Sequence, residues 1–217
     1  MKFTDDMAAA FPKRNPLPDV LRQALEFIEE HGCVRTRPDG NRYMTVYPAP
    51  EYDDMTHLAF HVPDPSDTAG WTHCNDSEVN DRLVIFLRTG GDGSWAGLWL
   101  DDDGQQRIVH LGSGSGSVML CVLTDNMEDL LRLLAIGYAD LCWPDNFERT
   151  PDDIFEEESD DDDDYTPPPL LFQDYVEATL GLSIPERASE IVLSTVGMDE
   201  EESDDPFWNW IKGLQRW

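Results

Sequence analysis

The chain has 217 residues, of which 40% are hydrophobic and 10% aromatic, a composition that excludes a fully disordered protein. Forty-five Asp and Glu residues against 15 Lys and Arg give a formal net charge of −30, which repels nucleic acid and anionic lipid and attracts basic partners. Because no segment has the apolar length of a signal peptide or a membrane span, the sequence predicts a cytoplasmic protein.

The N-terminal part is predicted to consist of an arm and a helix. Pro12 and Pro16 disfavour a helix over residues 1–16, so this segment is expected to be a loosely ordered arm. Apolar residues then recur at the spacing of one helical face. We therefore expect an amphipathic helix that begins at Pro18 and ends at Gly32.

The central part of the chain is predicted to form a β-meander. Apolar runs rich in β-branched and aromatic residues alternate there with turns rich in Gly, Asp and Ser. The predicted strands lie around Tyr43 to Tyr47 and at Leu58 to Val62, Val84 to Leu87, Trp95 to Leu100, Arg107 to Leu111 and Val118 to Leu123. The last strand carries almost no polar side chain, so we expect it at the centre of the sheet.

A leucine-rich helix is predicted to follow these strands. Gly112 to Ser117 is expected to be a flexible connection, and the helix after the last strand is expected to end at Gly137. Strands that lead into a helix with a leucine face indicate an α+β protein. We expect a mainly antiparallel sheet of about five or six strands with helices packed on one face, plus a C-terminal helical extension.

The motifs of this region resemble a known family. GGDGSWAGLWL is followed by a turn, by IVHLGSGSGS, and by a hydrophobic strand with a helix that ends in IGY. This order resembles the SUKH superfamily, and Leu17-Pro18 followed by Val20 to Gly32 is similar to the helix that opens its members. The resemblance covers Thr89 to Tyr138 and implies a SUKH-like α+β domain over residues 17–145. The family is best known for bacterial immunity proteins that neutralise toxins, and some eukaryotic members act as regulatory scaffolds.

The composition changes after this domain. Residues 146–169 contain the run DDIFEEESDDDDD, which repels itself and is expected to be a mobile insert. Residues 170–217 are expected to form a helical extension that packs on the core. The apolar stripe of the last helix consists of Phe207, Trp210, Ile211 and Leu214. Trp208 and Trp217 lie off this stripe.

A metal site is the first candidate for chemistry. His57 and His61 share a face, and Asp53 and Asp54 lie close by in the sequence. However, a structural zinc site needs four ligands at motif spacing, and nothing completes the set. The aspartates at positions 92 and 101–103 lack the bidentate glutamate of a calcium loop. We therefore expect no metal and no cofactor.

A hydrolase site is the second candidate. Ser113, Ser115 and Ser117 lie near His110, but a nucleophile elbow needs a strand-to-helix turn, whereas this loop joins two strands. We therefore expect no catalytic residue. An enzyme stays open as a third hypothesis, and a deep pocket that holds His57, His61 and a carboxylate would support it.

These observations lead to the hypothesis of a cytoplasmic immunity protein that binds one cognate toxin. The toxin is expected to be basic and to act on nucleic acid or nucleotides, while the protein itself is expected to bind neither nucleic acid nor a membrane. The expected partner-binding residues are Asp152, Asp153, Glu156, Glu157, Glu158, Asp160, Asp161, Asp162, Asp163, Asp164, Trp208 and Trp217. The alternatives are a solvated insert for the acidic run, core packing for the tryptophans, solubility or salt adaptation for the charge, and a regulatory scaffold for the whole protein.

Overall fold

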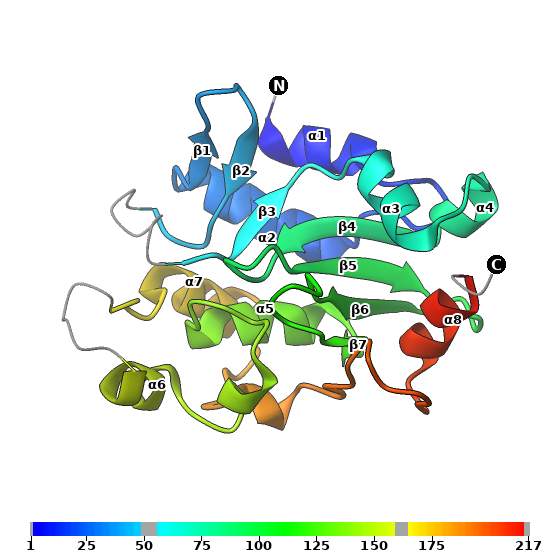
Figure 1. Ribbon diagram of the computed structural model, residues 1–217. Helices are drawn as coiled ribbons and strands as arrows, with labels where there is room; N and C mark the ends of the chain where they lie inside the picture. Colours follow the sequence, from blue (N-terminus) through cyan, green and yellow to red (C-terminus); the bar gives the residue numbers. More distant parts are fainter. Residues whose placement is uncertain (1, 49–55, 159–164, 215–217) are drawn as a thin grey trace.

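One antiparallel sheet organises the structure (Figure 1). The computed structural model describes residues 2–48, 56–158 and 165–214. Its seven strands pair in chain order, and each is antiparallel to the next. They are β1 (Val34–Thr36), β2 (Arg42–Met44), β3 (Ala59–His61), β4 (Leu83–Arg88), β5 (Trp95–Leu100), β6 (Gln106–Leu111) and β7 (Leu120–Thr124). The predicted α+β class is thereby confirmed, and β1 adds a strand to those that the sequence predicts.

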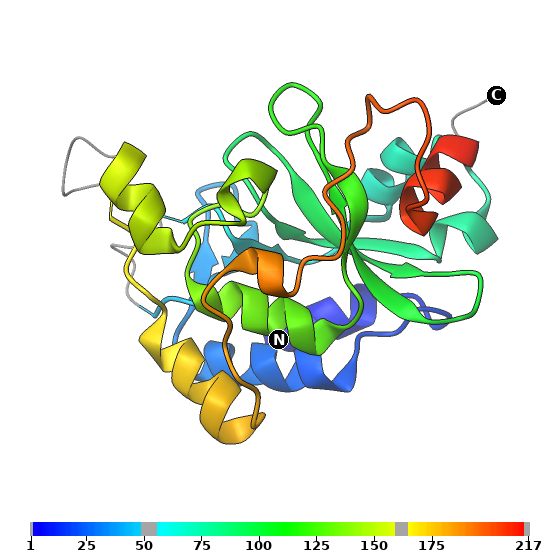
Figure 2. The ribbon, with the colours of Figure 1, turned by 90° about the horizontal axis from the view of Figure 1, so that it is seen from below.

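Four helices cover the first face of the sheet, as Figure 2 shows from below. They are α1 (Phe3–Ala10), α2 (Asp19–Glu30), α5 (Met127–Ile136) and α7 (Leu170–Asp174), which the π-helical turn η4 (Tyr175–Thr179) continues. The main hydrophobic core lies between these helices and the sheet. The predicted face of α2 is buried, and Gly137 ends α5 in the left-handed conformation, as expected.

Helix α1 replaces the loosely ordered arm expected over residues 1–16. Phe3 and Met7 are fully buried. The Glu29 carboxylate of α2 accepts hydrogen bonds from the backbone N–H of Phe3 at 2.6 Å and of Thr4 at 3.0 Å. These are N–H groups that the first turn of a helix leaves unpaired. The expectation was wrong because the capping group lies 25 residues downstream of Thr4, where local sequence reading does not look for it.

Helices α3 (Pro65–Thr72), α4 (Ser77–Asn80) and α8 (Pro206–Leu214) lie on the second face. Phe207, Trp208 and Ile211 of α8 pack against strand residues in a second hydrophobic cluster. Trp208 is 3% exposed, and its indole Nε1–H donates to the carbonyl oxygen of Gly197 at 2.9 Å. The interpretation of Trp208 as lying off the buried stripe is therefore wrong, whereas Trp210 is only half-buried.

Strand β7 lies at the end of the strand order, which corrects its expected central place. Residues 193–198 run beside it. The N–H of Leu120 donates to Val196 O at 2.7 Å, and Leu123 O accepts from the N–H of Leu193 at 2.9 Å. The strand is apolar because helices cover both of its faces and this segment covers its edge.

The remaining helical elements are short. They are α6 (Pro151–Glu158) and the 3-10 turns η2 (Pro144–Asn146) and η5 (Ala188–Glu190). Within the three described ranges, no helix combines the length and the apolar composition that crossing a bilayer requires.

Candidate partner-binding site

Helix α6 is an ordered part of the acidic segment. Thr150 and Asp153 cap its N-terminus reciprocally: each backbone N–H donates to the other residue's side-chain oxygen at 3.1 Å. The hydrogen bonds from Thr150 lower the pKa of the Asp153 carboxyl. Arg149 forms an ion pair with Glu157 at 2.8 Å, which ties the helix to the preceding turn.

Residues 151–158 are helical, where a mobile insert was expected. Ile154 and Phe155 are half-buried, and Ile154 packs against the main core, so two apolar side chains hold the helix against the protein. The side chains of Asp152, Asp153, Glu156 and Glu157 are exposed. Asp160, Asp161, Asp162, Asp163, Asp164 and Trp217 lie outside the described residues.

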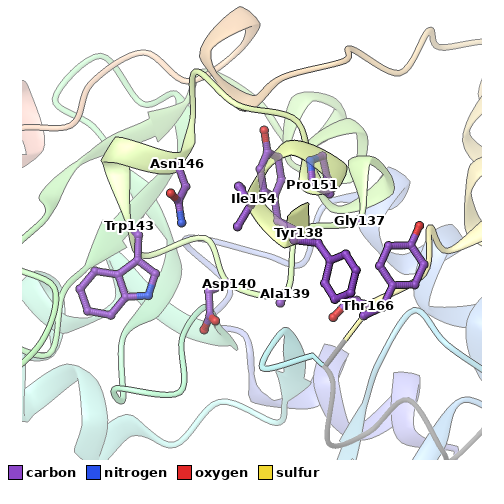
Figure 3. A pocket seen from close by; sticks show the side chains of 11 residues that line it. Gly137, Tyr138, Ala139, Asp140, Trp143, Asn146, Pro151, Ile154 and Thr166 are labelled. Atoms are coloured by element: carbon purple, nitrogen blue, oxygen red, sulfur yellow. The ribbon is translucent and has the colours of Figure 1, made fainter. Parts of the chain in front are cut away.

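A cavity of about 230 Å³, the α6 cavity, lies beside this helix (Figure 3). Its lining consists of Gly137, Tyr138, Ala139, Asp140, Trp143, Asn146, Pro151, Ile154, Phe155, Tyr165 and Thr166. Phe155 and Tyr165 meet edge to face, with ring centroids 4.9 Å apart and planes at 66°. The hydroxyl of Tyr165 donates to Asp152 Oδ1 at 3.2 Å, so the acidic helix orients one aromatic wall.

Trp143 is an exposed residue of the α6 cavity lining. Its side chain is 41% exposed, and it is the only exposed aromatic residue among those that the structure describes. Figure 3 shows it across from Pro151 and Ile154, with Asp140 between them. A tryptophan held at a surface in this way is a frequent anchor of protein interfaces.

The loop that carries Trp143 is fixed at several points. The hydroxyl of buried Tyr138 donates to Arg149 O at 2.6 Å and accepts from the N–H of Ala188 at 3.0 Å. The N–H of Leu141 donates to Thr89 O at 2.7 Å. A Cβ at Gly137, whose φ is +101°, would meet Pro169 at 3.0 Å. The cavity is therefore preformed in the protein.

Asp140 places a carboxylate at the α6 cavity. Its Oδ1 accepts from the N–H of Gly91 at 2.9 Å and lies 3.1 Å from Nδ1 of His57. The same His57 nitrogen lies 3.2 Å from Oδ2, so both carboxylate oxygens have a partner. A carboxylate has about four lone-pair directions, which leaves acceptor capacity on Oδ2 for a further group. Together with the exposed carboxylates of α6, Asp140 makes this surface strongly acidic.

The two histidines of the possible metal site separate in the structure. His57 contacts Asp140, whereas His61 stacks on Tyr43 and meets the edge of Trp95, with a centroid distance of 5.2 Å to the Trp95 ring. Burial lowers the pKa of His61 to about 4, so its ring is neutral at pH 7. Asp53 and Asp54 lie outside the described residues. Within the described ranges, no three side chains of the ligand types form a metal-binding group.

The serine-rich loop is tied down by a carboxylate. Asp92 accepts hydrogen bonds of 2.8 to 2.9 Å from the backbone N–H of Ser94 and Ser117 and from the hydroxyls of Ser94 and Ser113. Burial raises the pKa of Asp92, but these hydrogen bonds outweigh it and lower the pKa to about 2. A Cβ at Gly116 would lie 2.7 Å from the Asp92 carboxylate, so the close approach requires glycine. The ionised Asp92 carboxylate thus accepts the hydrogen bonds that hold this loop, where a flexible connection was expected.

His110 takes part in the fold and has no serine as a partner. Its Nδ1 lies 3.0 Å from Met119 O, a distance and partner that require Nδ1 to donate. Its Nε2 then accepts from the hydroxyl of Thr89 at 3.0 Å. Burial lowers its pKa to about 4. Both ring nitrogens are therefore engaged in holding strands together.

The structure separates the predicted site residues into two groups. The α6 carboxylates lie on the helix that borders the α6 cavity, whereas Trp208 lies in α8 at the opposite end of the molecule (Figures 1 and 2). Sequence reasoning did not assign Trp143, Asp140 or Tyr165 to the site. The signal for Trp143 was its place directly before Pro144, which disfavours a helix at the tryptophan and keeps it in a loop.

Comparisons with known proteins found no family model, no curated protein and no solved structure that matches the chain. The fold and the site therefore define its class in structural terms. It is an α+β protein with a seven-stranded meander sheet, and an acidic helix borders an aromatic cavity at one end. The resemblance to the SUKH superfamily stays a prediction.

Proposed function

We propose that the protein is a non-enzymatic immunity protein that binds and occludes a basic toxin acting on nucleic acid or nucleotides. The observation that carries this proposal is the joint exposure of Trp143, which lines a preformed cavity, and of four carboxylates on the helix that borders this cavity. An acidic surface attracts a basic partner, and an exposed aromatic residue supplies the apolar contact that holds it.

Charge and contact area have separate roles in this mechanism. The net charge of −30 raises the rate of encounter with a basic protein, and this effect falls as salt shortens the screening length to ~8 Å at physiological ionic strength. The side chains at the α6 cavity then set the rate of dissociation. Inhibition is stoichiometric, because the bound protein covers the basic surface that the toxin uses to bind nucleic acid.

Co-expression tests the proposal directly. The protein is produced in cells together with the toxin encoded beside its gene, and cell survival is measured with and without it. We expect survival only when the protein is present, and binding of the purified proteins in a 1:1 ratio. Full toxicity in the presence of folded protein would exclude the proposal and would favour the regulatory scaffold.

A matched pair of variants tests the place of binding. The first variant removes four charges from α6 (Asp152→Asn, Asp153→Asn, Glu156→Gln, Glu157→Gln). The control removes four charges from an exposed acidic cluster that precedes α8 (Glu200→Gln, Glu201→Gln, Glu202→Gln, Asp204→Asn). We expect association of the α6 variant to be slowed roughly tenfold at low salt and little at 1 M salt, where the screening length is ~3 Å. Equal association rates for the two variants would remove α6 from the mechanism.

A further inference from the structure

The α6 cavity has the size of one side chain. Its volume of about 230 Å³ is below the range of roughly 300 to 1,000 Å³ that is usual for sites of small molecules. Its walls are aromatic on two sides, with Trp143 on one side and the Phe155–Tyr165 pair among the other lining residues. The cavity therefore suits a group that stacks on rings.

The same cavity has a negative edge. Asp140 lines it directly, and Asp152 lies next to it through its hydrogen bond with Tyr165. The cationic side chain nearest in sequence to α6 is Arg149, which is engaged with Glu157 and with Asn146 Oδ1 at 3.0 Å. Figure 3 shows Asp140 beside Trp143, so a cation that entered there would meet a ring face and a carboxylate together, and both interactions favour it.

From this combination we propose that the α6 cavity is a receptor for one arginine side chain of the partner protein, which deepens the proposed function and rests on it. A guanidinium group is planar, stacks on aromatic faces and donates several hydrogen bonds in one plane, so Trp143 and Asp140 can contact it at the same time. A lysine ammonium is a more strongly hydrated point charge and matches this geometry less well. An apolar side chain would leave the Asp140 carboxylate without a new partner.

A short peptide tests the proposal without the toxin. The full-length protein is titrated with a capped Gly-Arg-Gly peptide, with its lysine counterpart, and with a citrulline peptide that keeps the shape of arginine but has no charge. Binding is followed by the NMR signal of the Trp143 indole N–H. We expect saturable binding of the arginine peptide, with the lysine peptide weaker and the citrulline peptide weaker by roughly tenfold or more.

Variants of the lining residues make the test specific. Trp143→Ala and Asp140→Asn should each weaken arginine-peptide binding roughly tenfold. Binding by these variants is measured from the NMR signals of the remaining indole N–H groups and of the backbone. Leu193→Ala is the control, because Leu193 is an exposed apolar residue outside the cavity, and this variant should bind as the unchanged protein does. Circular dichroism and the melting temperature show whether each variant is folded. If Asp140→Asn unfolds, Asp140→Glu replaces it, and a shifted carboxylate should also weaken binding.

Two results would overturn the arginine receptor. One is equal binding of the arginine and citrulline peptides, and the other is unchanged arginine binding by folded Trp143→Ala. The outcomes also separate the inference from the proposed function. Toxin neutralisation without peptide binding would leave the function and exclude the receptor. Peptide binding without toxin neutralisation would leave a cation receptor and exclude the toxin as its target.

Discussion

Two acidic segments of the chain look alike in sequence but differ in the structure. Both α6 and the segment that leads into α8 combine several carboxylates with aromatic residues. At α6 the carboxylates face solvent, and the tryptophan of the site, Trp143, is exposed. At α8, Asp205 is 8% exposed and Trp208 is 3% exposed. The same residue types thus form an exposed surface at one end, which we propose for recognition, and a structural joint at the other.

The difference comes from unpaired backbone groups. At the α8 joint, Asp205 Oδ2 accepts from the N–H of edge-strand residue Val122 at 2.9 Å, and Oδ1 accepts from the N–H of Trp208 at 2.9 Å. One carboxylate therefore pairs both the sheet edge and the start of a helix, where unpaired N–H groups are costly. At α6, Asp153 caps the start of its own helix through the N–H of Thr150, and the carboxylates of Asp152, Asp153, Glu156 and Glu157 stay exposed to solvent.

The largest difference between the two acidic segments is expected when their tryptophans are replaced and the free energy of unfolding is measured. Trp208→Ala removes a buried ring from the second hydrophobic cluster and should lower the free energy of unfolding by about 3 to 5 kcal/mol. Trp143→Ala is the matched control and should change it by no more than about 0.5 kcal/mol, because its ring is largely at the surface. Chemical denaturation measures both values. Equal losses for the two variants would contradict the assigned difference.

The carboxylate of the α8 joint should give the next largest effect. Asp205→Ala leaves the N–H groups of Val122 and Trp208 without their acceptor, so it should cost about 2 to 4 kcal/mol of unfolding free energy. Asp204→Ala, one residue earlier and exposed, should cost almost nothing. Hydrogen exchange at Val122 gives an independent readout, since its N–H should exchange faster only in Asp205→Ala.

A third carboxylate, Asp92, extends the comparison to pH. Its pKa in the folded protein is about 2, below the ordinary value of 3.8, because four hydrogen bonds favour the ionised form. A lowered pKa contributes stability that is complete above about pH 4 and is lost as the pH falls through about 2. Urea unfolding between pH 6 and pH 2 should therefore show a steeper loss of stability for the unchanged protein than for Asp92→Asn. If the stability of the two proteins falls equally with pH, Asp92 does not cause this pH dependence.

The smallest stability effect is expected at α6. The four-charge α6 variant keeps an oxygen at position 153 that can accept from the N–H of Thr150, and it removes repulsion between neighbouring carboxylates. Its unfolding free energy should therefore change by less than about 1 kcal/mol. Its effect should appear in partner association instead. A large loss of stability would place α6 among the structural elements and weaken its assignment as a recognition surface.

Local sequence patterns were sufficient for the centre of the fold. The range Trp95 to Leu100 is the same in prediction and structure, and α2 and the end of α5 at Gly137 also agree. These elements could be predicted because strand alternation, helical spacing and glycine at a helix end are properties of neighbouring residues. From the sequence, the candidate site could be predicted only as a region of negative charge. Its aromatic walls come from residues 143, 155 and 165, which are separated along the chain and are brought to one cavity only by folding.

What the sequence by itself determined is the α+β class, the order of the central strands and the acidic character of the chain. Tertiary structure alone decided that residues 3–10 are helical, that the apolar strand β7 lies at an edge and that Trp208 is buried. The physical reason is the same in each case. The Glu29 and Leu193 groups that pair with these backbone atoms, and the strand residues that cover Trp208, lie far away along the chain, and only folding brings them into contact.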